Sequence, residues 1–274
     1  MANKVEMPAT GSDTTTETST SQKKFVGSFR SVSKTIIIFI AILVFGSIAF
    51  ITTLAVMAHV SSIRASRAEY EGLRVLAGEA ESESGEFAVT PLSALDIEML
   101  QINPDYVGWL HIGGTGIDYP VVRGDDNEKY LDTSFYGEES VTGALFMDFR
   151  NVGNLLSSSA EDSVPHIIIF GHNLQQGGMF SDLRRFLKRE FLEENNIITL
   201  TVNDEVMEFQ IFSARLSDIE DPAYYINFGD SRSFPRFANR IDAPLRANQI
   251  ITLSTCVRGG SDDARIIVQG YRLA

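Results

Sequence analysis

The chain has 274 residues, of which 44% are apolar, 22% charged and 10% aromatic, and this ordinary globular composition excludes a wholly disordered, collagen-like or disulfide-rich protein. Its formal net charge of −13 argues against nucleic acid as a partner, because a polyanion would be repelled. The single cysteine, Cys256, excludes an intrachain disulfide and a multi-cysteine metal site, and four histidines leave little material for another kind of metal centre.

A Thr- and Ser-rich N-terminus precedes a long uncharged segment. We expect residues 1–34 to form a disordered cytoplasmic tail, because their Thr- and Ser-rich beginning has too few apolar residues to build a core. Residues 35–60 are rich in Ile, Phe, Val, Leu and Ala, and about 20 apolar residues suffice to cross a bilayer as a helix. The apolar part of a cleaved signal peptide is shorter, about 7–15 residues, so the length favours an uncleaved membrane anchor.

The flanks of this segment predict its orientation. On the N-terminal side no acidic residue lies between Glu17 and Lys34, whereas basic and acidic residues are mixed on the C-terminal side. The basic residues are Lys23, Lys24, Arg30 and Lys34 before the segment, and Arg64, Arg67 and Arg74 after it. Since basic flanks are retained in the cytoplasm, we expect a single-pass protein of the cell membrane whose N-terminus is cytoplasmic and whose C-terminal domain is extracellular.

Residues 61–91 are expected to connect the anchor to the extracellular domain. Residues 65–80 have the composition of a helix with mixed charges, and residues 81–90 form a linker rich in Ser, Glu and Gly without apolar periodicity. The remaining domain, residues 92–274, is predicted to open with a short helix over residues 94–101.

Strands dominate the rest of this domain. They alternate between apolar and polar residues or are continuously apolar, and turn residues separate them. The predicted strands cover residues 107–112, 117–122, 144–147, 166–170, 197–202, 206–215, 250–254 and 266–271. Short helices are predicted at residues 179–187, 190–194 and 233–241, the last inside a long insertion between residues 217 and 248. Because strands and helices do not alternate regularly, a β-barrel or sandwich is favoured over a doubly wound sheet.

Three polar residues stand at the ends of predicted strands, where binding and catalytic sites are commonly built. His172 follows a buried strand and a glycine, Cys256 lies at the end of a second apolar strand, and Arg265 begins the last strand, nine residues after the cysteine. Taken singly, each has an ordinary structural interpretation: a loop histidine, a buried apolar cysteine and a surface arginine. Together they provide a proton donor, a nucleophile and a cation that stabilises an oxyanion.

This combination suits acyl transfer through a thioester. A thiol is partly ionised near neutral pH, and a neighbouring cation increases the thiolate fraction. The thiolate attacks an amide carbonyl, the histidine gives a proton to the departing amine, and the arginine stabilises the oxyanion because it stays protonated and offers several donors. We therefore interpret His172, Cys256 and Arg265 as a candidate catalytic set.

These motifs resemble those of the sortases, the cysteine transpeptidases of Gram-positive cell surfaces. The stretch TLSTC at residues 252–256, followed by Arg265, is similar to the TLxTC…R signature of that family, and GHN at residues 171–173 is similar to its histidine motif. The resemblance covers about residues 94–274. It implies a closed eight-stranded β-barrel with short helices, no metal or organic cofactor, and catalytic roles for His172, Cys256 and Arg265.

Within the family the sequence is most similar to class B. Residues 103–109 (NPDYVGW), 117–122 (IDYPVV) and 146–148 (FMD) are similar to segments of that class, as is the long insertion before the cysteine strand. By analogy with class B substrate grooves, a peptide site would be lined by Asn127, Leu131, Tyr225, Ile226 and Ser254. The resemblance implies cleavage of a C-terminal sorting motif in secreted proteins, followed by transfer of the acyl group to an amine of a peptidoglycan precursor or of a pilin.

Two alternatives stay open on the sequence alone. Water in place of the amine would make the protein a cysteine peptidase, because the choice of acceptor depends on groove shape and on the exclusion of water. A buried, inert Cys256 would instead leave an adhesive or scaffolding β-domain on a membrane stalk.

Overall fold

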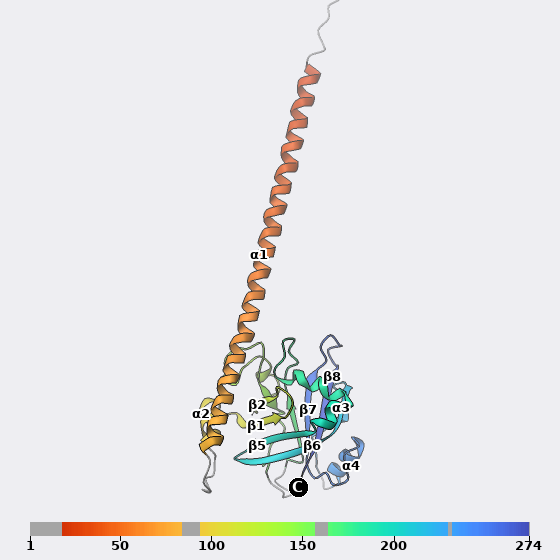
Figure 1. Ribbon diagram of the computed structural model, residues 1–274. Coiled ribbons are helices and arrows are strands. Elements are labelled where there is room, and N and C mark those ends of the chain that lie inside the picture. Colours follow the sequence, from red (N-terminus) through yellow and green to blue (C-terminus); the bar gives the residue numbers. More distant parts are fainter. Residues whose placement is uncertain (1–17, 84–93, 157–163, 230–231, 274) are drawn as a thin grey trace, which may run out of the picture. The chain divides into compact units, whose positions relative to one another are not determined.

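The computed structural model describes residues 18–83, 94–156, 164–229 and 232–273 (Figure 1). The first 17 residues, which belong to the predicted tail, and most of the linker predicted over residues 81–90 lie outside the described residues. The chain divides into two compact units, and the second unit begins at Val60.

Helix α1 (Thr18–Glu83) includes residues of both units. Among the described residues, its Lys34–Gly78 part is the one helix long and apolar enough to cross a membrane, with a mean hydropathy of 2.7 in its most apolar window. The large apolar side chains over residues 36–57 are exposed. The candidate membrane span thus includes the segment predicted to cross the membrane, residues 35–60. The helix predicted over residues 65–80 is part of the same helix, α1.

Eight strands form a closed barrel in the second unit, in the order β1-β2-β3-β4-β7-β8-β6-β5. They are β1 (Tyr106–Ile112), β2 (Asp118–Val122), β3 (Leu145–Met147), β4 (His166–Phe170), β5 (Ile197–Val202), β6 (Glu205–Ser217), β7 (Ile250–Cys256) and β8 (Arg265–Arg272). Pairing of β1 with β5 closes the sheet, and the pairs β2–β3 and β4–β7 are parallel. The predicted closed eight-stranded barrel is confirmed, and each predicted strand is present with its ends displaced by two residues at most.

Short helical segments connect the strands. They are the α-helices α2 (Ala94–Ile102), α3 (Arg189–Glu194) and α4 (Ser233–Arg240), and the 3₁₀ segments η1 (Lys129–Leu131), η2 (Phe180–Leu187) and η3 (Pro222–Tyr224). The helix predicted from residue 179 begins one residue later, because Met179 has a φ of 46° and cannot join a right-handed turn. The short segment η3 was not predicted. The side chain of Asp221 caps its start by accepting a hydrogen bond from the N–H of Ala223, and Pro222 occupies its first position.

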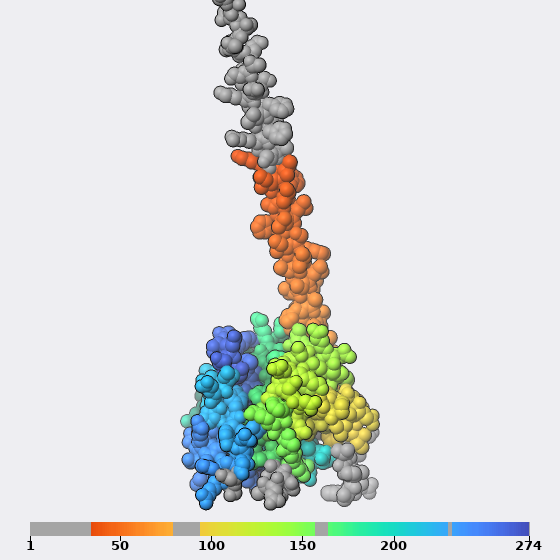
Figure 2. Space-filling view, turned by 180° about the vertical axis from the view of Figure 1, so that it is seen from behind, coloured from red at the N-terminus to blue at the C-terminus, as the bar shows by residue number. Residues whose placement is uncertain are grey.

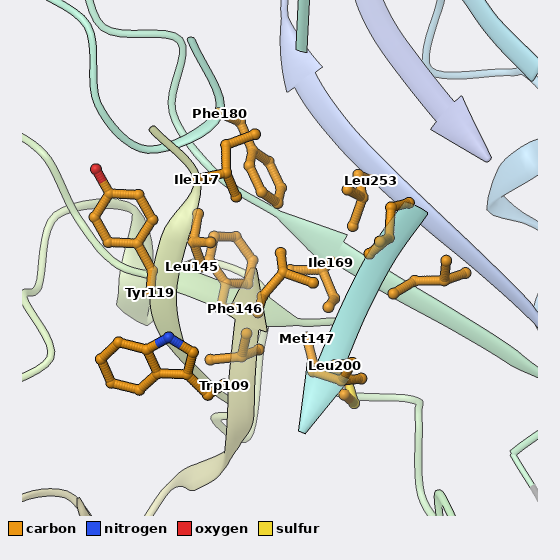
Figure 3. Close-up of a cluster of buried hydrophobic side chains, with 14 of the residues drawn as sticks. Trp109, Ile117, Tyr119, Leu145, Phe146, Met147, Ile169, Phe180, Leu200 and Leu253 are labelled. Atoms are coloured by element: carbon orange, nitrogen blue, oxygen red, sulfur yellow. The ribbon is translucent and has the colours of Figure 1, made fainter. Parts of the chain in front are cut away.

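Apolar side chains fill the barrel and also cover part of its outside. In the interior, Ile169 of β4 and Leu253 of β7 lie in one buried cluster with Leu145 of β3 (Figure 3). A second cluster gathers around Phe237 of α4 and covers Ile250 at the start of β7. Since β4 is buried along almost its whole length, its HIIIF sequence is a continuous apolar run rather than an alternating one.

The part of α1 that belongs to the second unit packs against the barrel. Ile63, Tyr70 and Leu73 are 6%, 4% and 0% exposed, and their spacing places them on one face of the helix. The Tyr70 hydroxyl also donates to the carbonyl of Gly143 at 2.9 Å. Residues 60–78 are therefore packed on the β-domain, whereas the sequence predicted only a connecting helix in this region.

Candidate active site

Two of the candidate catalytic residues, His172 and Cys256, lie at the ends of neighbouring strands. Strands β4 and β7 are parallel, and Phe170 lies opposite Ser254. Cys256, the last residue of β7, and His172, two residues beyond the end of β4, therefore lie at the same edge of the sheet, which is one end of the barrel. Asn173 joins the two segments, because its Nδ2 donates to the carbonyl of Cys256 at 2.9 Å. The sequence positions His172 and Cys256 by strand register rather than by nearness along the chain.

Arg265 completes this edge from β8. It lies opposite Cys256 in the antiparallel pairing of β7 with β8. Its Nη1 donates to the carbonyls of Asp262 at 2.6 Å and Ala264 at 3.0 Å, so these bonds do not use the N–H groups of Nε and Nη2. Cys256 is exposed, and the alternative of a buried apolar cysteine is therefore wrong. The structure brings all three candidate catalytic residues to one edge of the barrel.

The orientation of the His172 ring is set by the segment η1. The Nε2 atom of His172 lies 2.6 Å from the carbonyl oxygen of Leu131, the last residue of η1. A carbonyl oxygen only accepts, so Nε2 carries a hydrogen, and in the neutral ring the lone pair is then on Nδ1. Of the two ring nitrogens, Nδ1 is therefore the one that can accept a proton.

Three residues expected to line a peptide groove have accessible surface. Leu131 and Tyr225 expose 43% and 46% of their surface, and Ile226 is half-buried. Figure 2 shows one face of the molecule on which light green residues of the first half of the β-domain and blue residues of its C-terminal half both reach the surface. Leu131 adjoins His172 through its carbonyl, whereas the Tyr225 ring packs against Phe228 at a centroid distance of 5.4 Å.

The other two expected groove residues form hydrogen bonds with other side chains of the β-domain. The Nδ2 atom of Asn127 donates to a carboxylate oxygen of the buried Asp148 at 3.2 Å. Burial alone would raise the pKa of Asp148, but hydrogen bonds from Arg150 and Asn127 outweigh it and the pKa is lowered. Ser254 is 1% exposed, and its hydroxyl lies 2.7 Å from the hydroxyl of Tyr224. For Asn127 and Ser254, contact with a peptide stays a prediction.

Tyr224, the last residue of η3, belongs to the site and was missed by the sequence analysis. Besides its contact with Ser254, its ring stacks on Phe170 with a centroid distance of 6.3 Å and an angle of 13° between the planes. Burial raises the pKa of Tyr224, and the nearby Cys256 adds to this effect, whereas Ser254 and Arg265 act against it. The preceding Asp-Pro pair, which starts a short helix, is the sequence signal that could have drawn attention to this residue.

This edge of the barrel presents a thiol, an imidazole and a guanidinium on neighbouring strand ends. A thiolate is a strong nucleophile, an imidazole exchanges protons near neutral pH, and a guanidinium keeps its positive charge. Within the residues that the structure describes, no three His, Cys, Asp or Glu side chains gather as metal ligands. The arrangement suits nucleophilic acyl transfer.

Comparisons with known proteins match both the sequence and the fold. The family model described as the sortase domain matches residues 110–273. Sortase B of Listeria monocytogenes is 30% identical over 63% of this chain and 72% of its own length, and sortase B of Staphylococcus aureus is 30% identical over 61% and 70%. Among solved structures, Clostridium perfringens sortase B is 28% identical with a TM-score of 0.57, covering 65% of this chain and 99% of its own. A Staphylococcus aureus sortase B–substrate complex is 26% identical with a TM-score of 0.62, covering 77% of this chain and 97% of its own.

Proposed function

Because this chain belongs to the sortase family, whose enzymes are cysteine transpeptidases, we propose that it cleaves a C-terminal sorting motif of secreted proteins and transfers the acyl group to an amine. The chain is most similar to class B members of the family. One observation carries the proposal: the pairing of β4 with β7 and of β7 with β8 places His172, an exposed Cys256 and Arg265 at the same edge of the barrel.

In the first step the thiolate of Cys256 attacks the carbonyl carbon of the scissile peptide bond. A C–S bond forms, and the π electrons of the carbonyl move onto its oxygen, which becomes an oxyanion. Arg265 supplies the compensating positive charge. Because two backbone carbonyls hold its Nη1, the guanidinium is fixed in place while Nε and Nη2 keep their N–H groups for the substrate.

Collapse of the tetrahedral intermediate breaks the C–N bond and leaves a thioester on Cys256. Nδ1 of His172 takes the proton of the Cys256 thiol as the thiolate forms, and then gives this proton to the departing amine, since Nε2 is held by the carbonyl of Leu131. In the second step an amine attacks the thioester carbonyl and passes a proton to His172, and the C–S bond breaks to release the Cys256 thiolate. We infer that this amine comes from a peptidoglycan precursor or a pilin.

The Cys256→Ala variant tests the covalent step. The full chain in detergent micelles or nanodiscs is incubated with a library of peptides that end in candidate sorting motifs, and mass spectrometry detects the acyl-enzyme and its products. The wild-type protein should gain the mass of the N-terminal peptide fragment, and Cys256→Ala should form no adduct and no product. Cleavage by Cys256→Ala at the wild-type rate would contradict the proposal.

The same assay separates transfer from hydrolysis. Adding candidate amines, such as oligoglycine or a lysine-containing peptide, should yield a ligated product in place of free acid if the protein is a transpeptidase. Free acid alone with every amine would favour the cysteine peptidase. Absence of both products, together with slow alkylation of native Cys256, would favour a scaffolding domain.

We also propose that α1 anchors the protein in the cell membrane and that the β-domain lies outside the cell. The single, exposed cysteine makes the topology directly measurable. A maleimide that does not cross membranes should label Cys256 in intact cells, and the Cys256→Ala variant is the matched control. Labelling only after the cells are opened would place the β-domain in the cytoplasm.

A further inference from the structure

The loop that carries His172 is narrow and closed at its base. Residues 171–179, here called the His172 loop, connect β4 with η2. Asn173 and Met179 form a β-bridge across the base, and the N–H of Phe180 donates to the carbonyl of His172 at 2.9 Å. The segment that leads into η2 is therefore tied directly to the backbone of His172 and Asn173.

The segment of the His172 loop that leads into η2 has a backbone that few residues adopt. Gly177 and Gly178 have φ values of 82° and 96°, and Met179, which is not a glycine, has a φ of 46°. Such a conformation persists only where the surroundings fix it. One fixing contact is the hydrogen bond from the N–H of Met179 to the hydroxyl of Tyr119 at 3.2 Å, which ties the loop to β2.

A second set of contacts comes from helix α1. The Nη2 atom of Arg67 donates to the carbonyls of Gln176 and Gly177, the latter at 3.3 Å. The helix also supports Tyr119, since the Tyr70 ring packs edge-on against the Tyr119 ring at a centroid distance of 5.3 Å. A cleft of about 40 Å³ between the two segments is lined by residues of both, among them Ser66, Arg67 and Arg74 of the helix and Leu174 and Gly178 of the loop.

The helix is held on the barrel independently of Arg67. Arg74, seven residues further along α1, donates from Nε to the carbonyl of Asp118 at 2.9 Å and from Nη2 to the carbonyl of Gly116 at 3.1 Å. Leu73 is completely buried beside it. Arg67 and Arg74 thus make the same kind of contact from the same helix, but only Arg67 hydrogen-bonds to the His172 loop. The guanidinium of Arg74 instead lies over the ring of Tyr119, at 4.7 Å from its centroid.

We propose that residues 60–78 of α1 position the catalytic histidine, and that Arg67 is a positioning residue acting through the carbonyls of Gln176 and Gly177. This inference rests on the proposed function, because it assigns His172 a catalytic role. It means that the competent enzyme begins within the membrane-proximal part of α1 and not at the first residue of the barrel.

The test compares Arg67→Ala with Arg74→Ala in the full chain in micelles. Loss of the Arg67 contacts should lower kcat on a cleaved peptide roughly tenfold and leave KM within about twofold, because small misplacements of a catalytic group are costly while the groove is unchanged. Arg74→Ala removes a cation from the face of Tyr119 but no hydrogen bond to the loop, and should leave kcat within about threefold. Arg67→Lys should recover part of the loss, since an ammonium can reach one of the two carbonyls.

Two further readouts do not need a substrate. Hydrogen exchange of the amides of residues 176–180 should become faster in Arg67→Ala than in Arg74→Ala. The pH profile of Cys256 alkylation should also move in Arg67→Ala, because a displaced imidazole changes the thiolate fraction. A wild-type exchange pattern and alkylation profile in Arg67→Ala would overturn the inference, as would equal losses in both variants.

These readouts also keep the two proposals apart. If no peptide is cleaved by the wild-type protein, the proposed function fails, yet the alkylation profile and the exchange rates still decide whether Arg67 positions the His172 loop. If the wild-type protein is active and Arg67→Ala matches it in all three measurements, only the positioning role is refuted.

Discussion

Lowering the pH should destabilise the fold through His166, a histidine with no exposed surface at the start of β4. Its Nδ1 donates to the carbonyl of Tyr225 at 2.8 Å, and its Nε2 then accepts from the hydroxyl of Thr252 at 2.8 Å. The oxygen of that hydroxyl already accepts from Nε2 of Gln269 at 3.0 Å, and the Phe237 ring lies 4.6 Å from the imidazole. A second imidazole proton, on Nε2, would displace the hydroxyl hydrogen of Thr252, which would then lose its acceptor.

The size of the effect follows from the pKa. Burial lowers the pKa of His166 from 6.5 to about 4, although the hydrogen bond to Tyr225 opposes this shift. The unfolded chain therefore binds a proton as the pH falls below 6.5, while the folded protein stays neutral until about pH 4. Stability is complete above pH 6.5 and is lost between pH 6.5 and 4. At about 1.4 kcal/mol per pH unit, the loss is about 2 kcal/mol by pH 5 and about 3 kcal/mol in full.

Urea titrations at pH 8 and pH 5 measure this loss. Trp109, the single tryptophan, lies in β1 and is 7% exposed, so its fluorescence reports unfolding of the barrel. The non-titrating variant His166→Gln is the control, because the carboxylates make the same contribution in both proteins. The difference in unfolding free energy between the two pH values should be larger for the wild-type protein by about 2 kcal/mol.

Equal pH dependence in the two proteins would refute the reasoning. An NMR titration of the wild-type protein gives an independent answer if the variant folds poorly. The imidazole resonances of His166 should show a neutral ring at pH 5, and a midpoint near 6.5 would contradict the predicted burial effect.

Two other substitutions act close to the active site. Tyr224→Phe removes the hydrogen-bonding partner of the buried Ser254 hydroxyl. A urea titration should show the fold retained and a loss of about 1 kcal/mol in the free energy of unfolding, and a loss above about 3 kcal/mol would contradict this. Gly171→Ala would place a Cβ 2.4 Å from a methyl group of Leu145 and 2.9 Å from the ring of Phe180. It should cost about 1–3 kcal/mol and lower peptide cleavage at least tenfold, because the histidine follows directly; unchanged cleavage would show that the strand end tolerates the shift.

The strands of the barrel were predictable because their pattern is local. The apolar runs and the turns between them fixed the positions of all eight strands, and the ends of β4, β7 and β8 identified the candidate catalytic residues. The order of the strands in the sheet was not predictable from such patterns, since parallel pairing of β4 with β7 joins segments separated by a long insertion. Only the resemblance to a known family indicated that the sheet closes.

The parts that the sequence missed depend on contacts between distant segments. Tyr224 enters the site because a three-residue helix turns its hydroxyl toward Ser254, and no periodic pattern marks so short an element. The packing of α1 on the barrel was missed for a related reason. Its buried face includes the small polar residue Ser66 and a hydrogen-bonded Tyr70, and charged residues lie between them, so the segment looks like an exposed helix.

The proposed nucleophile and its guanidinium partner lie on the last two strands of the barrel, while the histidine comes after the fourth. A folding intermediate in which β7 has formed but β8 has not yet paired with it therefore holds the thiol without its guanidinium neighbour. Parallel pairing between distant strands is slow to form, because a long stretch of chain must be ordered first. The three groups therefore come together at this edge only when the antiparallel pair β7–β8 has docked on the rest of the barrel.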